Sequence, residues 1–198
     1  MQKFLIIILA FLFLVTGCDN KKESSTSHST SKIKVKEQNS TTVTKNKPTK
    51  EIIFNLETID GKKFHLKEID NGLDIQEIKN KVTFLIFFGH SCPPCLREIP
   101  KLIQISKKYK DLSILAIEVQ GLNKTKLIDF AKRKGINYNL ITLSNGMNFV
   151  SYIQAKANWS GAIPFLLGFN KKGKVVIIHV GGLLKEQLEQ AYNELIKE

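Results

Sequence analysis

The hydrophobic pattern of the chain contains two short runs that are apolar at almost every position, at 82–88 and 112–119. Runs of this length are typical of strands buried on both faces, as in a parallel sheet. Between them, residues 93–109 are apolar at helical spacing. A strand, a helix and a second strand in this order predict a βαβ crossover with parallel strands.

The same pattern predicts elements on both sides of this unit. Ahead of it, β-rich segments at 51–60 and 62–66 meet at Asp60-Gly61, which indicates a hairpin, and a short helix is expected at 66–69. After it we expect a helix at 123–134, a strand at 139–143, a helix at 146–153, a hairpin of strands at 165–169 and 175–180, and a closing helix at 183–197. The predicted fold class is α/β, with a mixed central sheet flanked by helices and an added N-terminal β-hairpin.

The first residues follow a pattern of a different kind, because Lys3 precedes a continuous apolar run at 5–15. This run is shorter than the roughly 20 residues that a spanning helix needs, and it has the length of a signal-peptide core. Val-Thr-Gly-Cys follows at 15–18 and resembles the lipobox of bacterial lipoproteins. That resemblance implies cleavage after Gly17 and lipidation of Cys18. The alternative is an ordinary signal peptide or an uncleaved anchor.

From residue 20 to residue 50 the chain is mainly Ser, Thr, Lys, Asn and Gln. Such a segment cannot offset the entropy of ordering, so its composition predicts a disordered tether. The remainder has the length of about one domain. The expected organisation is a lipoprotein signal peptide at 1–17, the lipidated cysteine with its tether at 18–48, and a single domain at 49–198.

Basic charge is spread along the whole chain, whose formal net charge is +12. A nucleic-acid partner would call for clustered basic residues interleaved with aromatics. That pattern is missing from the sequence, so we expect no nucleic-acid binding. A basic surface suits an anionic membrane instead.

The chain has three cysteines, too few for a disulfide framework. Cys92 and Cys95 lie where the first buried strand gives way to a helix, and two intervening residues let their sulfurs bond. Pro93 and Pro94 suit a first helical turn, which leaves Cys92 at the helix N-terminus. The free N–H groups and the macrodipole there favour a thiolate. We therefore expect Cys92 to attack in thiol–disulfide exchange and the more shielded Cys95 to resolve.

Three other uses of this cysteine pair compete with redox exchange. A structural zinc site needs four ligands, and only His90 is close in sequence. An inert disulfide in so short a loop contributes little stability. A Cu(I) chaperone would use the soft thiolates together with His90 or His179. Redox exchange is favoured, with no resident metal and no cofactor.

The segment 87–100, with its Cys-Pro-Pro-Cys and the Glu98-Ile99-Pro100 that follows, resembles the active-site segment of the TlpA/ResA branch of thioredoxin-like proteins. Ile163-Pro164 is a further matching element, and the resemblance covers nearly the whole domain. The branch comprises extracytoplasmic, membrane-attached thiol–disulfide oxidoreductases, so the resemblance implies a thioredoxin-like fold. Family members usually carry aromatic residues just before the cysteines. This chain departs from that pattern at 88–91, which leaves partner choice and redox tuning open.

The resemblance also implies roles for supporting residues. Pro164 is expected to be cis beside Cys92, leaving the Ile163 backbone free to pair with a client strand. Glu98 matches a glutamate near the family's cysteines, where a buried carboxyl can exchange protons with Cys95. The alternative for Glu98 is a solvated residue that favours the helix dipole.

For three further residues near the predicted site, a structural role is set beside a role in the chemistry. Glu118 interrupts an apolar strand and is expected to point to solvent. His90 is expected to be an exposed loop residue rather than a cation that favours the Cys92 thiolate. Trp159 either shapes the partner surface or packs in the core.

The function implied by the resemblance is disulfide exchange with client proteins, in the reducing direction. The clients would carry disulfides or CXXC thiols, as in cytochrome c maturation or metal-site assembly, and a membrane electron-donor protein of the thiol-transfer type would recharge the site. The lipid on Cys18 would hold the protein on a bacterial membrane, facing the periplasm or the cell exterior. A Cu(I) metallochaperone and a disulfide oxidant or isomerase remain as alternatives.

Overall fold

The computed structural model describes residues 51–197. The predicted signal peptide, the tether and Cys18 lie outside the described residues. Within 51–197, no helix has the length and apolar character to cross a bilayer.

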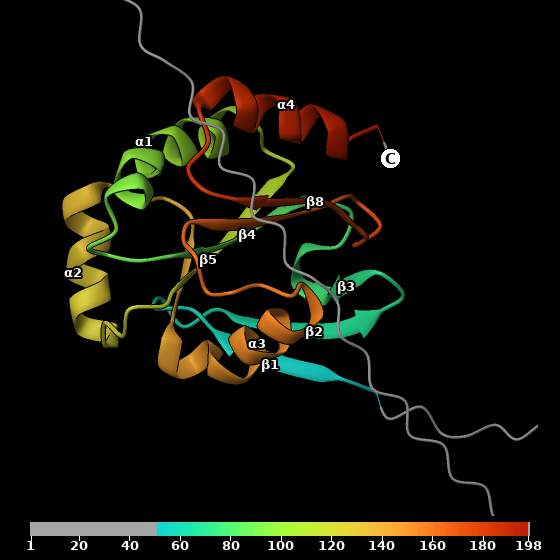
Figure 1. The fold of residues 1–198 in the computed structure, drawn as a ribbon, viewed down its shortest axis with the longest axis horizontal. Helices are drawn as coiled ribbons and strands as arrows, with labels where there is room; N and C mark the ends of the chain where they lie inside the picture. Colours follow the sequence, from blue (N-terminus) through green and yellow to red (C-terminus); the bar gives the residue numbers. More distant parts are fainter. Residues whose placement is uncertain (1–50, 198) are drawn as a thin grey trace, which may run out of the picture. The chain divides into compact units, whose positions relative to one another are not determined.

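A five-stranded sheet forms the centre of the domain (Figure 1). Its strand order is β6-β5-β4-β7-β8. The three strands β4, β5 and β6 run parallel, and β7 and β8 are antiparallel additions. Their bounds are Val82–Phe88 for β4, Leu112–Glu118 for β5, Asn139–Thr142 for β6, Phe165–Phe169 for β7 and Val175–Val180 for β8. Every residue of β4 and β5 is buried, which confirms the prediction of strands covered on both faces.

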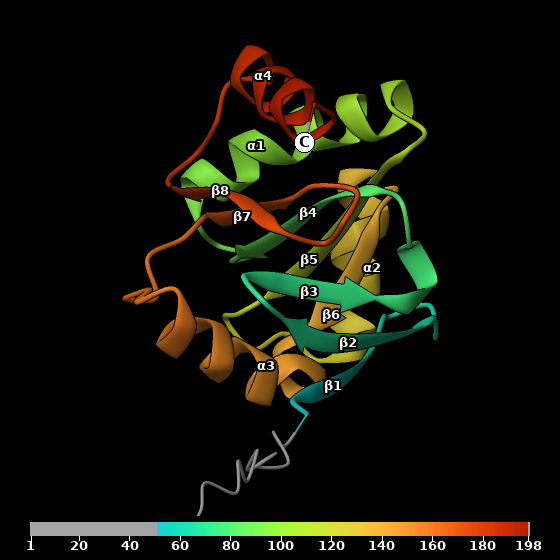
Figure 2. The same ribbon diagram turned by 90° about the vertical axis from the view of Figure 1, so that its right-hand side faces the viewer.

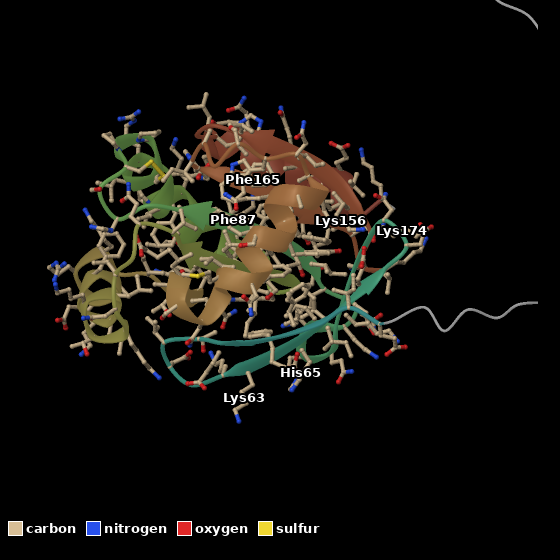
Figure 3. The ribbon with its side chains drawn as sticks, turned by 60° about the horizontal axis from the view of Figure 1, so that its bottom comes forward. Lys63, His65, Phe87, Lys156, Phe165 and Lys174 are labelled. Atoms are coloured by element: carbon tan, nitrogen blue, oxygen red, sulfur yellow. A yellow bond between two sulfur atoms is a disulfide. The ribbon has the colours of Figure 1, made fainter. Side chains whose placement is uncertain are left out.

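Helices cover both faces of this sheet. Helices α1 (Pro93–Lys108), α2 (Lys124–Lys134) and α4 (Lys185–Leu195) pack on one face, and α3 (Leu143–Lys156) packs on the other (Figure 2). The alternation of β4 divides its side chains between two cores, with Phe84, Ile86 and Phe88 on the α1 side. Phe87 and Phe165 lie on the α3 side, as Figure 3 shows.

The N-terminal strands form a separate sheet of three strands, β1 (Ile53–Glu57), β2 (Lys63–Ile69) and β3 (Gly72–Ile75), followed by a short 3₁₀ helix, η1 (Gln76–Ile78). The predicted hairpin is confirmed as β1–β2. The short helix predicted at 66–69 is wrong, because these residues continue β2 and pair with β3. Leu66 is buried, and Asn71 adopts the left-handed conformation in the turn between β2 and β3. Both features favour an extended strand over a helix at 66–69.

The two sheets are joined where β3 meets the β7–β8 hairpin. The Leu73 N–H donates to the Gly173 carbonyl at 2.9 Å, and the Val175 N–H donates to the Asn71 carbonyl at 2.9 Å. Gly72 permits this close approach, because the Gly173 carbonyl oxygen lies where a Cβ would stand.

The later elements follow the predictions with shifted ends. Both strands of the β7–β8 hairpin have the predicted bounds. Asn123 caps α2, and Gly135 ends it with a φ of 65°. Helix α3 is longer than predicted, because the Thr142 side chain accepts the Asn145 N–H and starts the helix earlier.

Candidate redox site at the start of helix α1

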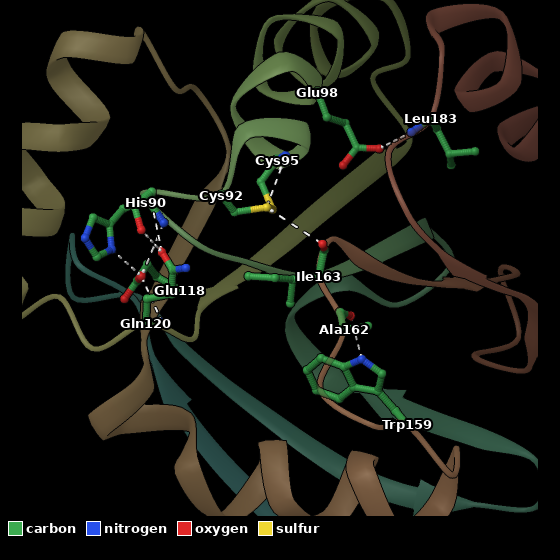
Figure 4. The surroundings of a disulfide bond; sticks show 11 residues. His90, Cys92, Cys95, Glu98, Glu118, Gln120, Trp159, Ala162, Ile163 and Leu183 are labelled. Atoms are coloured by element: carbon green, nitrogen blue, oxygen red, sulfur yellow. Dashed lines mark hydrogen bonds and ion pairs between the residues drawn. A yellow bond between two sulfur atoms is a disulfide. The ribbon is translucent and has the colours of Figure 1, made fainter.

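Cys92 and Cys95 form a disulfide at the point where β4 gives way to α1 (Figure 4). Cys92 is the N-cap of the helix, and its Sγ accepts the Cys95 N–H at 3.3 Å. Cys92 is 7% exposed and Cys95 is 2% exposed. The geometry therefore makes Cys92 the outer sulfur of the pair and the one aligned with the helix N-terminus.

The two prolines between the cysteines limit the donors available to Cys92. An N-cap side chain normally accepts an N–H from the second or third helical residue. Pro93 and Pro94 are the first and second helical residues and carry no N–H. The Cys92 sulfur is left with the N–H of Cys95, the third residue, as its helical donor.

The Ile163–Pro164 peptide bond is cis, as the family resemblance implied. The Ile163 carbonyl oxygen lies 3.7 Å from Cys92 Sγ, so the backbone before β7 faces the redox sulfur (Figure 4). Behind this segment, the Trp159 Nε1–H donates to the Ala162 carbonyl at 2.7 Å, and its ring stacks on Phe165 at 4.7 Å between centroids. Trp159 is buried, so of the two interpretations packing is the correct one.

Glu98 lies one turn into α1 from Cys95 and is only 3% exposed. Its carboxylate accepts the Leu183 N–H at 2.8 Å, and the Lys101 ammonium donates to the Leu183 carbonyl at 2.8 Å. Burial raises the pKa of Glu98 above its ordinary value, although the Leu183 bond and Lys101 oppose the shift. Glu98 is thus a buried acid in the redox helix itself and not a solvated residue.

The raised pKa of Glu98 gives a testable dependence of stability on pH. Native Glu98 binds its proton more tightly than the unfolded chain does, so its contribution is full below the ordinary pKa of 4.5 and is lost as pH rises through the folded pKa. Glu98→Gln keeps an acceptor for the Leu183 N–H but has no charge. Urea unfolding of both proteins between about pH 4 and about pH 8 should show the wild type losing stability relative to the variant as pH rises. Parallel stability curves would mean that the pKa of Glu98 is not raised by folding.

The prediction that Glu118 points to solvent is wrong, because its side chain is fully buried. Its Oε1 lies 2.9 Å from His90 Nδ1. The prediction of an exposed loop residue at His90 is confirmed only in part, since 33% of its side chain is exposed and its ring is turned toward Glu118 (Figure 4). No local sequence pattern indicates this pairing, because the two residues meet only when β4 and β5 lie side by side.

Two other histidines in the described part of the chain do not join the site. His65 bonds to Glu77 in the N-terminal sheet, and His179 lies on β8 opposite Leu166. Across residues 51–197, no group of three or more His, Cys, Asp or Glu side chains gathers where a metal ion could be held.

Comparison with known proteins identifies the same chemistry. The family model described as Redoxin matches residues 55–195. The chain is similar to the thiol–disulfide oxidoreductase ResA of Halalkalibacterium halodurans, with 27% identity covering 68% of this chain and 73% of that protein. It is similar to ResA of Bacillus subtilis, with 28% identity covering 73% of this chain and 72% of that protein. The solved structure of StoA from Bacillus subtilis shares the fold, with a TM-score of 0.53 and 22% identity over 71% of this chain and 96% of that one.

Proposed function

The chain belongs to the Redoxin family and is a TlpA/ResA-like thiol–disulfide oxidoreductase, and we propose that it works outside the cytoplasm as a reductant of client disulfides. In this direction the Cys92 thiolate attacks a client disulfide, a mixed disulfide forms, and Cys95 displaces the client as a dithiol. The client gains two electrons from the cysteine pair and two protons, one from the Cys95 thiol and one from solvent, and the Cys92–Cys95 disulfide is left behind.

One observation supports the reducing direction: the Cys95 N–H is the single helical N–H group that donates to Cys92 Sγ. A pair is a strong oxidant when its reduced form is stabilised, chiefly by N–H groups around the thiolate. Here the two prolines remove one of the two N–H groups that normally reach an N-cap side chain. The thiolate is therefore less stabilised, the disulfide is favoured, and electrons leave the pair readily.

The backbone beside the cis proline supports the proposal that a client protein binds next to Cys92. The Ile163 carbonyl faces Cys92 Sγ, in a position where an extended client segment can pair with it. The proposed clients carry CXXC disulfides, such as those of cytochrome c maturation or metal-site assembly, as the resemblance to the TlpA/ResA branch implies. A membrane protein of the thiol-transfer type would then restore the reduced pair.

The direction of electron flow is tested by mixing the reduced protein with a peptide that carries an oxidised CXXC pair. We expect the peptide to be reduced nearly to completion while the Cys92–Cys95 disulfide accumulates, as counted by thiol alkylation and mass spectrometry. Net oxidation of the reduced peptide by the disulfide form of the protein would instead identify an oxidant.

We propose in addition that Cys18 carries lipid and anchors the protein to the membrane, as the lipobox resemblance implies. Mass spectrometry of the mature protein should find an N-terminal Cys18 with acyl chains, and Cys18→Ala should release the protein from the membrane fraction. A mature chain with an unmodified Cys18 would rule out this anchor.

A further inference from the structure

The loop that presents Cys92 consists of three small or polar residues, Gly89, His90 and Ser91. It lies beside the loop that follows β5, because β4 and β5 are parallel neighbours and end at the same edge of the sheet. The Cys92 N–H donates to the Gly89 carbonyl at 3.3 Å, so the position of the cysteine depends on the path of this loop. The contacts that hold this loop in place therefore affect the position of Cys92 during the reaction.

Glu118, the last residue of β5, gathers donors from both loops. Its Oε1 accepts the backbone N–H of His90 at 3.4 Å and of Gln120 at 3.0 Å, and it lies 2.9 Å from His90 Nδ1. Its Oε2 accepts the Leu122 N–H at 2.8 Å. Three backbone N–H groups thus donate to the Glu118 side chain, whose oxygens can accept them all, and these bonds offset the cost of burying it.

Gln120 fixes the rest of the loop. Its Oε1 accepts both the backbone N–H of Ser91 at 2.9 Å and the Ser91 hydroxyl at 2.8 Å. The Gln120 side chain also occupies the space that a Cβ on residue 89 would need, so Gly89 is the residue that fits there. Two of the three residues between β4 and Cys92 are thus hydrogen-bonded to Glu118 or Gln120, and the third, Gly89, packs against the Gln120 side chain.

We propose that Glu118 is a positioning residue for disulfide exchange. It holds the loop at 89–91 so that Cys92 Sγ stays at the N-terminus of α1, facing the Ile163 carbonyl. All of its hydrogen-bond partners lie in the two loops beside the site. Removing its charge should therefore affect Cys92 more than the fold as a whole.

The test is a comparison of Glu118→Gln with Glu77→Gln in the full-length protein. Glu77 is a matched control, because it also accepts a backbone N–H and contacts a histidine Nδ1, but does so at His65 in the N-terminal sheet. In Glu118→Gln the amide N–H₂ must face a donor, so the loop has to move. We expect the rate constant for attack on a small disulfide, expressed per Cys92 thiolate, to fall about tenfold in Glu118→Gln and to be unchanged in Glu77→Gln.

Expressing the rate per thiolate separates positioning from ionisation, and urea unfolding identifies any variant that is simply unstable. If Glu118→Gln does not fold, a second pair of variants, His90→Asn and His90→Gln, provides the test. His90→Asn can place an N–H where Nδ1 stands, whereas the N–H₂ of His90→Gln lies one bond further out, so His90→Asn should lose less of the rate.

A folded Glu118→Gln variant that reacts at the wild-type rate per thiolate would overturn the proposal. So would an equal loss in the two His90 variants. Both comparisons are ratios to wild type in a single attack step, so they hold whichever way electrons flow in the cell. An error in the reducing direction would appear only in the peptide experiment described above.

Discussion

Cys92→Ala abolishes disulfide exchange, whereas Cys95→Ala leaves a protein that captures its clients as lasting mixed disulfides. The expected loss in Cys92→Ala is at least about a thousandfold, because the attacking thiolate itself is removed. Cys92 is the N-cap of α1 and its sulfur faces the Ile163 carbonyl, where a client would lie. Cys95 is the more shielded sulfur, and its task is to release the client.

The measurement is isolation of crosslinked partners from cells that express the full chain with Cys95→Ala, followed by reduction and mass spectrometry. The partners would also name the pathway. Cys92→Ala with Cys95 intact is the matched control and should capture nothing. Capture by Cys92→Ala and none by Cys95→Ala would reverse the roles of the two cysteines.

Pro94→Ala makes the redox pair more oxidising, whereas Pro93→Ala changes it little. Position 94 is the second helical residue, so the alanine variant supplies the N–H that an N-cap side chain normally accepts. One hydrogen bond to a charged group is worth about 1.5 kcal/mol, which corresponds to about a tenfold stabilisation of the thiolate. Stabilising the reduced form by this amount raises the reduction potential by up to about 30 mV.

The check is equilibration of each variant with a glutathione buffer, together with the ultraviolet absorbance of the Cys92 thiolate across pH. Pro93→Ala is the control, because the N–H of the first helical residue is not aimed at the N-cap side chain. Equal shifts in the two variants would point to a general loosening of the helix start. No shift in Pro94→Ala would show that the missing N–H does not set the potential.

The sheet and the cysteine pair were predictable from the sequence because their signals are local. Strands β4 and β5 are buried at every position, so their apolar runs are continuous. The position of Cys92 as N-cap follows from two prolines at the start of an amphipathic helix. The cis bond before Pro164 came only from the family resemblance, since an isolated proline is trans by default.

The supporting acids could not be predicted in the same way, because their surroundings come from distant parts of the chain. Glu98 accepts the N–H of Leu183, which is 85 residues away. Glu118 contacts His90, 28 residues away, and a charged residue at a strand end ordinarily faces water. Strand β3 was missed because its four residues acquire their pairing only from β2 and the β7–β8 hairpin.

The reduction potential of the Cys92–Cys95 pair in the full-length protein tests the proposed reducing role most directly. It is measured by equilibrating the protein with defined mixtures of reduced and oxidised dithiothreitol and counting free thiols by mass spectrometry. We predict a potential near or below that of thioredoxin, about −270 mV. A value above about −180 mV, in the range of protein disulfide isomerase, would contradict a reductant and identify an oxidant or isomerase.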